Sequence, residues 1–147
     1  MVMTNLLDVN FLIALAWPSH VHHQIARGWF EENHNDGWAT CPFTQAGFVR
    51  LSSSPKVIED AVTPKEAIAL LSQIVKMKGH HFWNQDFGIM DKQVPTQHIS
   101  GHRQVTDVFL LATAIRHKGQ LVTLDYTIPH LLPKNSKLHH HISVIRV

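Results

Sequence analysis

Residues 3–8, Met-Thr-Asn-Leu-Leu-Asp, form an apolar run of strand length that ends in a carboxylate. Residues 120–125, Gln-Leu-Val-Thr-Leu-Asp, repeat this arrangement near the other end of the chain. Stretches with the periodicity of helices separate such runs, and this alternation is typical of βαβ units. We therefore predict an α/β protein with three α/β/α layers and a mostly parallel central sheet of about five strands. The predicted strands are 3–7, 38–41, 80–83, 120–124 and 142–147.

Two of the predicted helices carry clear terminal signals. Residues 63–66, Thr-Pro-Lys-Glu, form a capping box with proline at the first helical position, and Gly79 is expected to stop the apolar stripe that follows. A second stripe over 108–115 predicts a helix that runs to Lys118, with Gly119 as its C-cap. Two shorter helices are predicted, around 21–30 and over 43–51.

Composition points to one soluble domain spanning 1–147. Of the 147 residues, 44% are hydrophobic and 16% charged, which excludes the signature of disorder. The net charge of +2 permits an anionic partner without requiring one. A single cysteine, Cys41, excludes an internal disulfide. The apolar stretch at 6–17 is interrupted by polar residues, is too short to span a bilayer and has no basic segment before it. We expect a cytoplasmic protein without a membrane partner.

Three of the eleven carboxylates, Asp8, Asp107 and Asp125, lie in or against apolar runs. Asp8 and Asp125 each follow a predicted strand, and Asp107 falls in the first turn of the helix that ends at Lys118. Strand carboxyl ends and the N-termini of crossover helices share one sheet edge, so the three meet if the first and fourth strands are neighbours. Two carboxylates about 4 Å apart repel by roughly 4 kcal/mol, which a cation would neutralise. Oxygen ligands without cysteine or paired histidines favour Mg²⁺ or Mn²⁺ over zinc.

Each of these residues also has a purely structural interpretation. Asp8 and Asp125 could each cap a helix, and Asp107 could complement a helix dipole. Asn10 could orient a ligand or satisfy the backbone, and Thr123 could be a core strand residue or could support the site with its hydroxyl. Three independent placements at one edge favour a metal site, where a bound ion can activate water against a phosphodiester.

Three motifs resemble PIN-domain nucleases and, more narrowly, the VapC-type toxins of bacterial toxin-antitoxin modules. They are Leu-Leu-Asp-Val-Asn-Phe-Leu at 6–12, Gly-His-Arg-Gln-Val-Thr-Asp-Val-Phe-Leu-Leu-Ala-Thr-Ala at 101–114 and Leu-Val-Thr-Leu-Asp at 121–125. The segment His-Phe-Trp-Asn-Gln-Asp at 81–86 also fits, and the resemblance covers nearly the whole chain. It implies a metal-dependent endoribonuclease with a four-acid site, which acts on RNA, is inhibited by a cognate antitoxin protein and forms a homodimer.

The resemblance assigns three of the four acids to Asp8, Asp107 and Asp125. Asp8 and Asp107 would be direct metal ligands, and Asp125 would hold a second ion or a bridging water. The family usually has a glutamate where this chain has Gln45, within Thr-Gln-Ala-Gly-Phe-Val-Arg at 44–50. Gln45 could offer a carbonyl oxygen but brings no charge, so metal binding should be weaker. A catalytically weak or silent PIN-like protein that binds antitoxin or RNA is therefore the alternative.

Further residues could contact the partners. Arg50, Arg103 and His102 lie near the inferred mouth of the site, where arginine could contact RNA phosphates; surface ion pairs are the structural alternative. The apolar side chains of Val21, Ile25 and Trp29 could pack internally or form a docking groove for an antitoxin helix.

A third hypothesis is an α/β protein with a nucleophilic aspartate, either a receiver domain or a phosphatase. A haloacid-dehalogenase-like phosphatase requires a second aspartate where Asn10 stands. A receiver domain requires paired acids after the first strand. Neither pattern is present in this chain.

Overall fold

Five parallel strands form one sheet across residues 2–147, the part of the chain that the computed structural model describes. Their order is β3-β2-β1-β4-β5, with β1 in the centre. In the register, Leu6 lies beside Ala39 on one side and Leu121 on the other. All five predicted strands are confirmed, each shorter than predicted. The strands are β1 (Asn5–Leu7), β2 (Trp38–Thr40), β3 (His80–Phe82), β4 (Gln120–Thr123) and β5 (Ile142–Val144).

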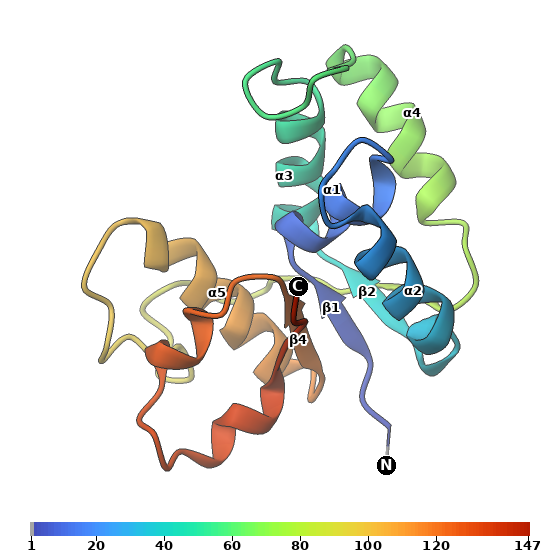
Figure 1. Cartoon of the computed structure of the whole chain (residues 1–147). Coiled ribbons are helices and arrows are strands. Elements are labelled where there is room, and N and C mark those ends of the chain that lie inside the picture. The colour runs from blue at the N-terminus through green and yellow to red at the C-terminus, as the bar shows by residue number, and fades with distance from the viewer. Residues whose placement is uncertain (1) are drawn as a thin grey trace.

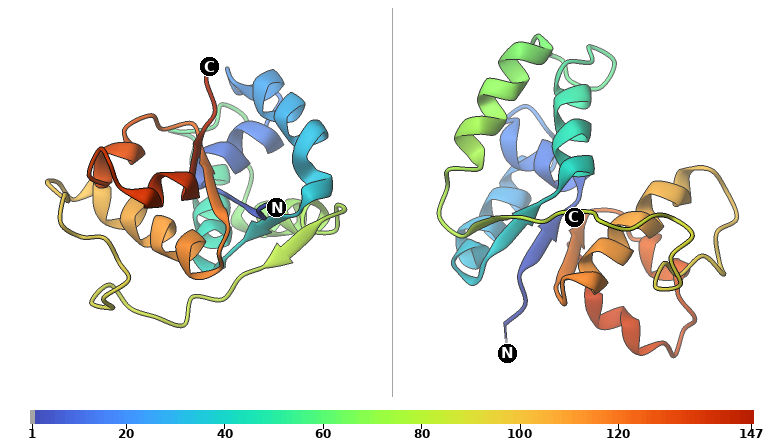
Figure 2. Two further views of the ribbon diagram at one scale, coloured as in Figure 1. Left: turned by 90° about the horizontal axis from the view of Figure 1, so that it is seen from below. Right: turned by 180° about the vertical axis from the view of Figure 1, so that it is seen from behind.

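Helices cover both faces of the sheet, as Figures 1 and 2 show. The helices are α1 (Val9–Ala16), α2 (His23–Asn33), α3 (Pro42–Ser52), α4 (Pro64–Ile74) and α5 (Arg103–Arg116). The short 3₁₀ segments are η1 (His34–Asp36), η2 (Ile128–Leu131) and η3 (Lys137–His141). The first four helices form one layer, and α5 with η2 and η3 forms the other. None of the helices within residues 2–147 has the length and hydropathy needed to cross a membrane.

Alternating strand side chains build two cores. Leu6 and Leu121 belong to the apolar cluster under α5, whereas Leu7 and Val122 belong to the cluster under the first four helices. All four side chains are fully buried. Because successive side chains of a strand point to opposite faces, β1 and β4 each contribute to both cores. The predicted three-layer α/β/α architecture is therefore confirmed.

The path of the chain through the sheet creates a topological switch point between β1 and β4. From β1 the chain runs outward through β2 and β3, then returns over α5 to β4 on the other side of β1. Open parallel sheets bind ligands at such a switch point, beyond the carboxyl ends of the strands. The first and fourth strands are neighbours, as the predicted meeting of the three acids requires.

The ends of α5 differ from the prediction. The helix begins at Arg103, because the Gln104 side chain accepts hydrogen bonds from the Ser100 and Gly101 amides just before it. Asp107 therefore lies in the second turn rather than the first, where the helix dipole has less effect.

The C-terminal end of α5 also differs. The helix ends at Arg116 with His117 as its C-cap, and Lys118, not Gly119, has the positive φ of 56°. Glycine is needed at 119 for a different reason: a Cβ there would lie 2.5 Å from the carbonyl oxygen of Thr4.

Helices α3 and α4 are confirmed with two differences. Gly47 lies inside α3, where a Cβ would come within 2.8 Å of a Val9 methyl group, so glycine allows α3 to pack closely on the start of α1. Helix α4 begins with the predicted capping box but ends at Ile74, before Gly79. Ile68 of its apolar stripe stays 56% exposed, because it borders a hollow between α3 and α4.

Candidate active site

Asp8 stands at the carboxyl end of β1 and is almost fully buried. One carboxylate oxygen accepts a hydrogen bond from the Val9 amide at 2.7 Å, and the other accepts one from the Thr123 hydroxyl at 2.7 Å. Asp8 is thus the N-cap of α1, which is the structural role considered for it from the sequence. It also lies at the switch point between β1 and β4. Burial raises the pKa of its carboxyl group above the usual value.

Thr123 joins the ends of β1 and β4. Its fully buried hydroxyl donates to Asp8 and accepts from the Asp125 amide at 3.0 Å and from the Asn10 side chain at 3.3 Å. Asn10 in turn accepts from the Leu124 amide at 3.2 Å. Thr123 therefore supports the site through its hydroxyl, and Asn10 satisfies the backbone of the neighbouring strand. Together they hold Asp8 and Asp125 in a defined relative position.

Asp125 lies just after β4 in a tight turn. Its Oδ1 atom accepts from the amide of Thr127 at 2.9 Å and from the Thr127 hydroxyl at 2.6 Å. No regular α-helix follows, since the next element is the 3₁₀ segment η2. The carboxylate therefore stabilises the turn that carries it rather than the N-terminus of an α-helix.

Asp107 is the third carboxylate at this edge. It is half-buried, and none of the hydrogen bonds among residues 2–147 involves its side chain. Burial, followed by the negative charges of Asp8 and Asp125, raises the pKa of Asp107 to about 6. The charge of Asp125 also raises the pKa of Asp8. The charges of the three carboxylates therefore oppose one another's ionisation. That the three side chains form one site stays a prediction.

Within residues 2–147, no cationic side chain forms an ion pair with these acids. The ion pairs within residues 2–147 join Arg27 to Glu31 and Arg116 to Asp86 and Asp91, so none includes the three carboxylates. In that same part of the chain, no group of three or more His, Cys, Asp or Glu side chains lies close enough together to hold a metal ion. The potential donors are hard oxygen atoms, and this chemistry fits Mg²⁺ or Mn²⁺.

Gln45 lies near the start of α3 and contacts the end of β2, which is on the opposite side of β1 from β4. Its side-chain NH₂ donates to the Thr40 hydroxyl at 3.0 Å, and that hydroxyl lies 2.7 Å from Nε2 of His80. Burial lowers the pKa of His80, which favours the neutral ring. Sequence reasoning missed Thr40 and His80; the signal was that Thr40 ends β2 as Thr123 ends β4.

The chain is similar in sequence to a known protein family. The PIN domain family matches residues 6–131, a range that includes Asp8, Gln45, Asp107 and Asp125. The chain belongs to the PIN-domain family. Two similar proteins are Mycobacterium tuberculosis Ribonuclease VapC39, 48% identical over 124 residues (84% of this chain, 89% of the relative), and Ribonuclease VapC38, 47% identical over 132 residues (88% and 92%). Ribonuclease VapC44 of the same species is 40% identical over 127 residues (86% and 89%).

The predicted RNA contacts of this VapC-type PIN domain lie on its surface. Arg103 begins α5 one helical turn before Asp107, on the same side of the helix. His102 precedes it and is exposed. Arg50 borders the hollow of about 620 Å³ between α3 and α4, which Gln45 also borders. Neither arginine takes part in an ion pair within residues 2–147, so the structural alternative is absent there.

Proposed function

We propose that the protein is the toxin component of a toxin-antitoxin module, an endoribonuclease that hydrolyses RNA phosphodiester bonds with Mg²⁺ or Mn²⁺. The observation that carries this proposal is that the charges of Asp8, Asp107 and Asp125 oppose one another's ionisation and have no ion-pair partner within residues 2–147. The similarity to proteins named as VapC ribonucleases supports the reaction class.

Asp8 and Asp107 would hold the metal ion directly. Each Asp8 oxygen accepts one hydrogen bond and retains a further lone pair for a ligand. Among residues 2–147, no hydrogen bond involves the Asp107 side chain, so this side chain can turn toward Asp8. Asp125, held by its turn, would bind a second ion or orient a bridging water. A bound divalent cation supplies positive charge that activates a water molecule and neutralises phosphodiester oxygens.

The remaining residues position the reacting groups. Thr123 holds Oδ2 of Asp8 and the Asp125 amide through one hydroxyl, which keeps the two acids at a constant separation. Arg103 would contact a phosphate of the RNA strand on the side of α5 that carries Asp107, and Arg50 and His102 would extend that contact. Arginine suits this role because its guanidinium matches phosphate oxygens in pairs.

Metal-dependent RNA cleavage tests the proposal. Wild type should cleave RNA when Mg²⁺ is added, and Asp8→Asn and Asp107→Asn should lose both cleavage and growth inhibition while remaining folded. Glu31→Gln is the matched control, because it removes one negative charge from the exposed pair on α2. Retained cleavage in either site variant would contradict the assignment.

Gln45 favours the second candidate, a PIN-like protein that binds RNA or antitoxin with little or no cleavage. Its NH₂ group donates to Thr40, so position 45 contributes no charge to the acidic edge. Wild type and Gln45→Glu discriminate the two functions in an RNA cleavage assay over a range of Mg²⁺ concentrations. Cleavage by wild type, at a lower Mg²⁺ requirement in the variant, supports the enzyme. Cleavage by the variant alone supports the second candidate.

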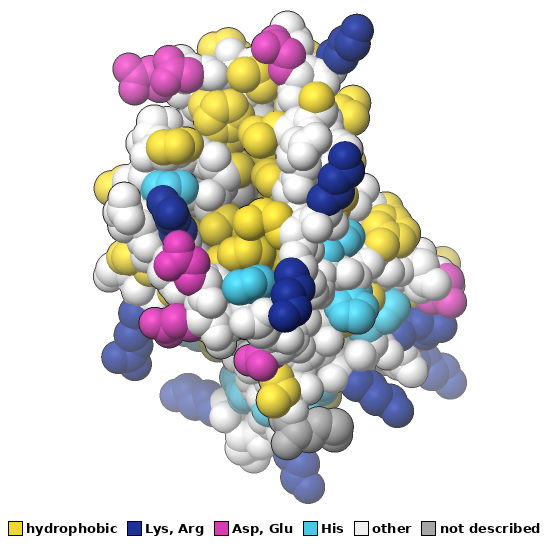
Figure 3. Space-filling view, turned by 90° about the vertical axis from the view of Figure 1, so that its right-hand side faces the viewer, with side chains coloured by type: hydrophobic (Ala, Val, Ile, Leu, Met, Phe, Trp, Pro, Cys, Tyr) yellow, Lys and Arg dark blue, Asp and Glu magenta, His cyan; other side chains and the backbone are white. Residues whose placement is uncertain are grey.

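We place the antitoxin on the face made by α2 and α4. Val21 is 83% exposed and Ile25 39%, whereas Trp29 packs edge-on against Phe11. Figure 3 shows hydrophobic side chains gathered in the middle of this face, with charged side chains of both signs around them. Such a face suits the apolar side of a partner helix.

Co-expression tests this partner. The product of a short reading frame next to this gene should co-purify with wild type and suppress RNA cleavage, and Ile25→Glu should weaken both effects without reducing cleavage by the free protein. Unchanged co-purification of Ile25→Glu would place the antitoxin elsewhere. We also propose a homodimer, which light scattering of the purified protein should detect.

A further inference from the structure

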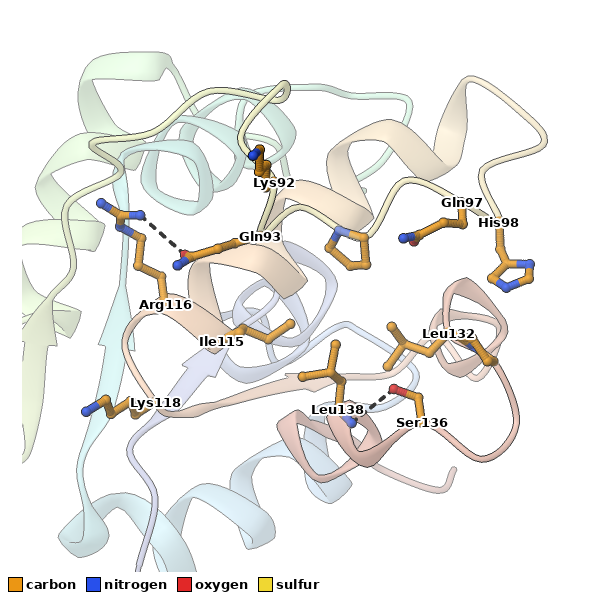
Figure 4. A pocket seen from close by; sticks show the side chains of 12 residues that line it. Lys92, Gln93, Gln97, His98, Ile115, Arg116, Lys118, Leu132, Ser136 and Leu138 are labelled. Carbon is orange, nitrogen blue, oxygen red and sulfur yellow. Dashed lines mark hydrogen bonds between the residues drawn. The ribbon is translucent and has the colours of Figure 1, made fainter.

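A separate cavity lies beside the C-terminal half of α5, and none of the three acids of the proposed site lines it. Its volume is about 950 Å³, and three segments enclose it: the end of α5, the loop over 92–98 and the segment over 132–138. Figure 4 shows the side chains from these three segments that surround it. This volume lies at the upper end of the range for small-molecule sites in proteins.

The cavity is positively charged. Lys92, Arg116 and Lys118 lie toward one end of it, where Arg116 and Lys118 extend outward, and His98 lies toward the other end, as Figure 4 shows. No aspartate or glutamate is among its lining residues in residues 2–147. Arg116 is paired with nearby carboxylates, but neither lysine takes part in an ion pair in the same range. An anionic group is therefore the complementary ligand for the lysine end.

The rest of the cavity suits a flat ring with polar edges. Ile115, Leu132 and Leu138 form an apolar side, and the amide side chains of Gln93 and Gln97 lie across from it. Apolar surface accepts the face of a nucleobase, while side-chain amides can donate to and accept from its edges. Cations at one end and this slot beside them together match a nucleoside phosphate.

The backbone at Lys118 is a separate observation. Lys118 has a φ of 56°, and within residues 2–147 it is the one residue other than glycine with a positive φ. Glycine is the least strained residue in this conformation at the end of a helix. The chain instead has a lysine here, and that lysine borders the cavity.

We propose that this cavity binds a nucleotide of the single-stranded RNA substrate, away from the bond that is cleaved. The inference rests on the proposed function. Arg116 follows Asp107 by nine residues on α5, a rise of roughly 14 Å along the helix. Nine residues also turn the helix by about 900°, which places the two side chains on opposite sides of α5, so a bound strand must cross α5 to reach both places. A free nucleotide has the same chemistry, and the experiment below distinguishes the two sources.

RNA binding by charge-matched variants tests the cavity. The background is Asp107→Asn, which prevents cleavage, and the probe is a fluorescent single-stranded RNA of mixed sequence, followed by anisotropy at several salt concentrations. Lys92→Gln with Lys118→Gln should weaken binding roughly tenfold at low salt and make the plot of log affinity against log salt shallower by roughly 1.4. The control, Lys56→Gln with Lys76→Gln, removes the same charge from the α3–α4 loop and the end of α4.

Lys118→Gly separates binding from folding. Glycine relieves the positive φ, so the melting temperature should stay the same or rise. RNA affinity should nevertheless fall. A loss of affinity together with undiminished stability supports the proposal, because a purely structural role for Lys118 predicts no loss of RNA binding.

Three outcomes overturn the proposal. If the lysine variants and their control bind RNA with equal affinity, the cavity does not contact the RNA. Mononucleotide binding that depends on Lys92 and Lys118, with unchanged RNA affinity, assigns the cavity to a free nucleotide. If wild type also cleaves RNA, either result leaves the proposed function intact. A wild type that neither binds nor cleaves RNA overturns both.

Discussion

The ionised form of Asp107, which the proposed metal binding requires, destabilises the metal-free protein. Its pKa of about 6 means that the folded protein holds a proton between pH 4 and 6 that the unfolded chain, with the ordinary value of 3.8, has already released. The stability contributed by this group therefore falls as pH rises through that window. At neutral pH the ionised carboxylate destabilises the metal-free protein.

Asp107→Asn should therefore abolish cleavage and stabilise the metal-free protein. At pH 7 the expected gain is roughly 2 kcal/mol, given about 1.4 kcal/mol for each unit of pKa and partial screening of a half-buried group. The gain should shrink as pH falls to 4, where the aspartate is protonated as well. Urea unfolding at pH 4 and pH 7 with EDTA measures this difference, and a gain that does not change with pH would contradict the cause given.

Thr123→Val should damage the site without changing its shape. The substitution removes a buried hydroxyl that serves Asp8, Asn10 and the Asp125 amide, at a cost of about 1–3 kcal/mol for polar groups left without partners. Cleavage should fall with it, because Asp8 loses the donor that favours its charged form. Thr123→Ser keeps the hydroxyl and should restore most of both. Equal loss in both variants would show that the methyl group matters instead.

The positions of some candidate site residues could be predicted from the sequence. Asp8 and Asp125 could be placed at one edge because each directly follows a strand, and the strand pattern is readable from apolar runs. The hydrogen bond from Gln45 to Thr40 and the contact with His80 could not be predicted, because they depend on side-chain directions across two neighbouring strands. The turn of α5 that carries Asp107 was misplaced, because Gln104 sets the start of that helix by bonding back to the preceding loop.

At the level of elements, two helical glycines provide a matched pair. A Cβ at Gly47 of α3 would press on Val9, the first residue of α1, whereas a Cβ at Gly28 of α2 would meet nothing within 4 Å. Alanine improves helix propensity by about 1 kcal/mol at either site. At Gly47 that gain is opposed by overpacking against a stiff β-branched side chain, which costs about 1–3 kcal/mol.

Gly47→Ala should therefore destabilise the protein by about 1 kcal/mol, and Gly28→Ala should stabilise it by a similar amount. Gly47→Ala should also weaken metal binding, because a shift of Val9 disturbs the amide that caps Asp8. Denaturant unfolding and Mg²⁺ titration measure the two effects. Stabilisation by both substitutions would mean that Val9 moves aside at little cost.

For the whole molecule, Mg²⁺ should act as a stabilising ligand. At ten times its dissociation constant a cation that binds only the folded state adds roughly 1.4 kcal/mol, or roughly 3–6 °C in melting temperature for a chain of this size. The shift should be reversed by EDTA. It should vanish in the double variant Asp8→Asn, Asp107→Asn, and a shift of the same size there would place the cation outside the proposed site.

The amino-acid sequence by itself determined the α/β/α class and the five strands, and it singled out the three acids as candidates, because apolar periodicity and strand-end positions are local properties. The three-dimensional arrangement decided what those acids do to one another: the pairing of β1 with β4 brings Asp8 and Asp125 together, and α5 adds Asp107. It also decided that Lys92, Arg116 and Lys118 share a cavity with no acid in its lining among residues 2–147. Electrostatic coupling depends on distance through space, and only the packed fold sets the distance between groups so far apart in the chain.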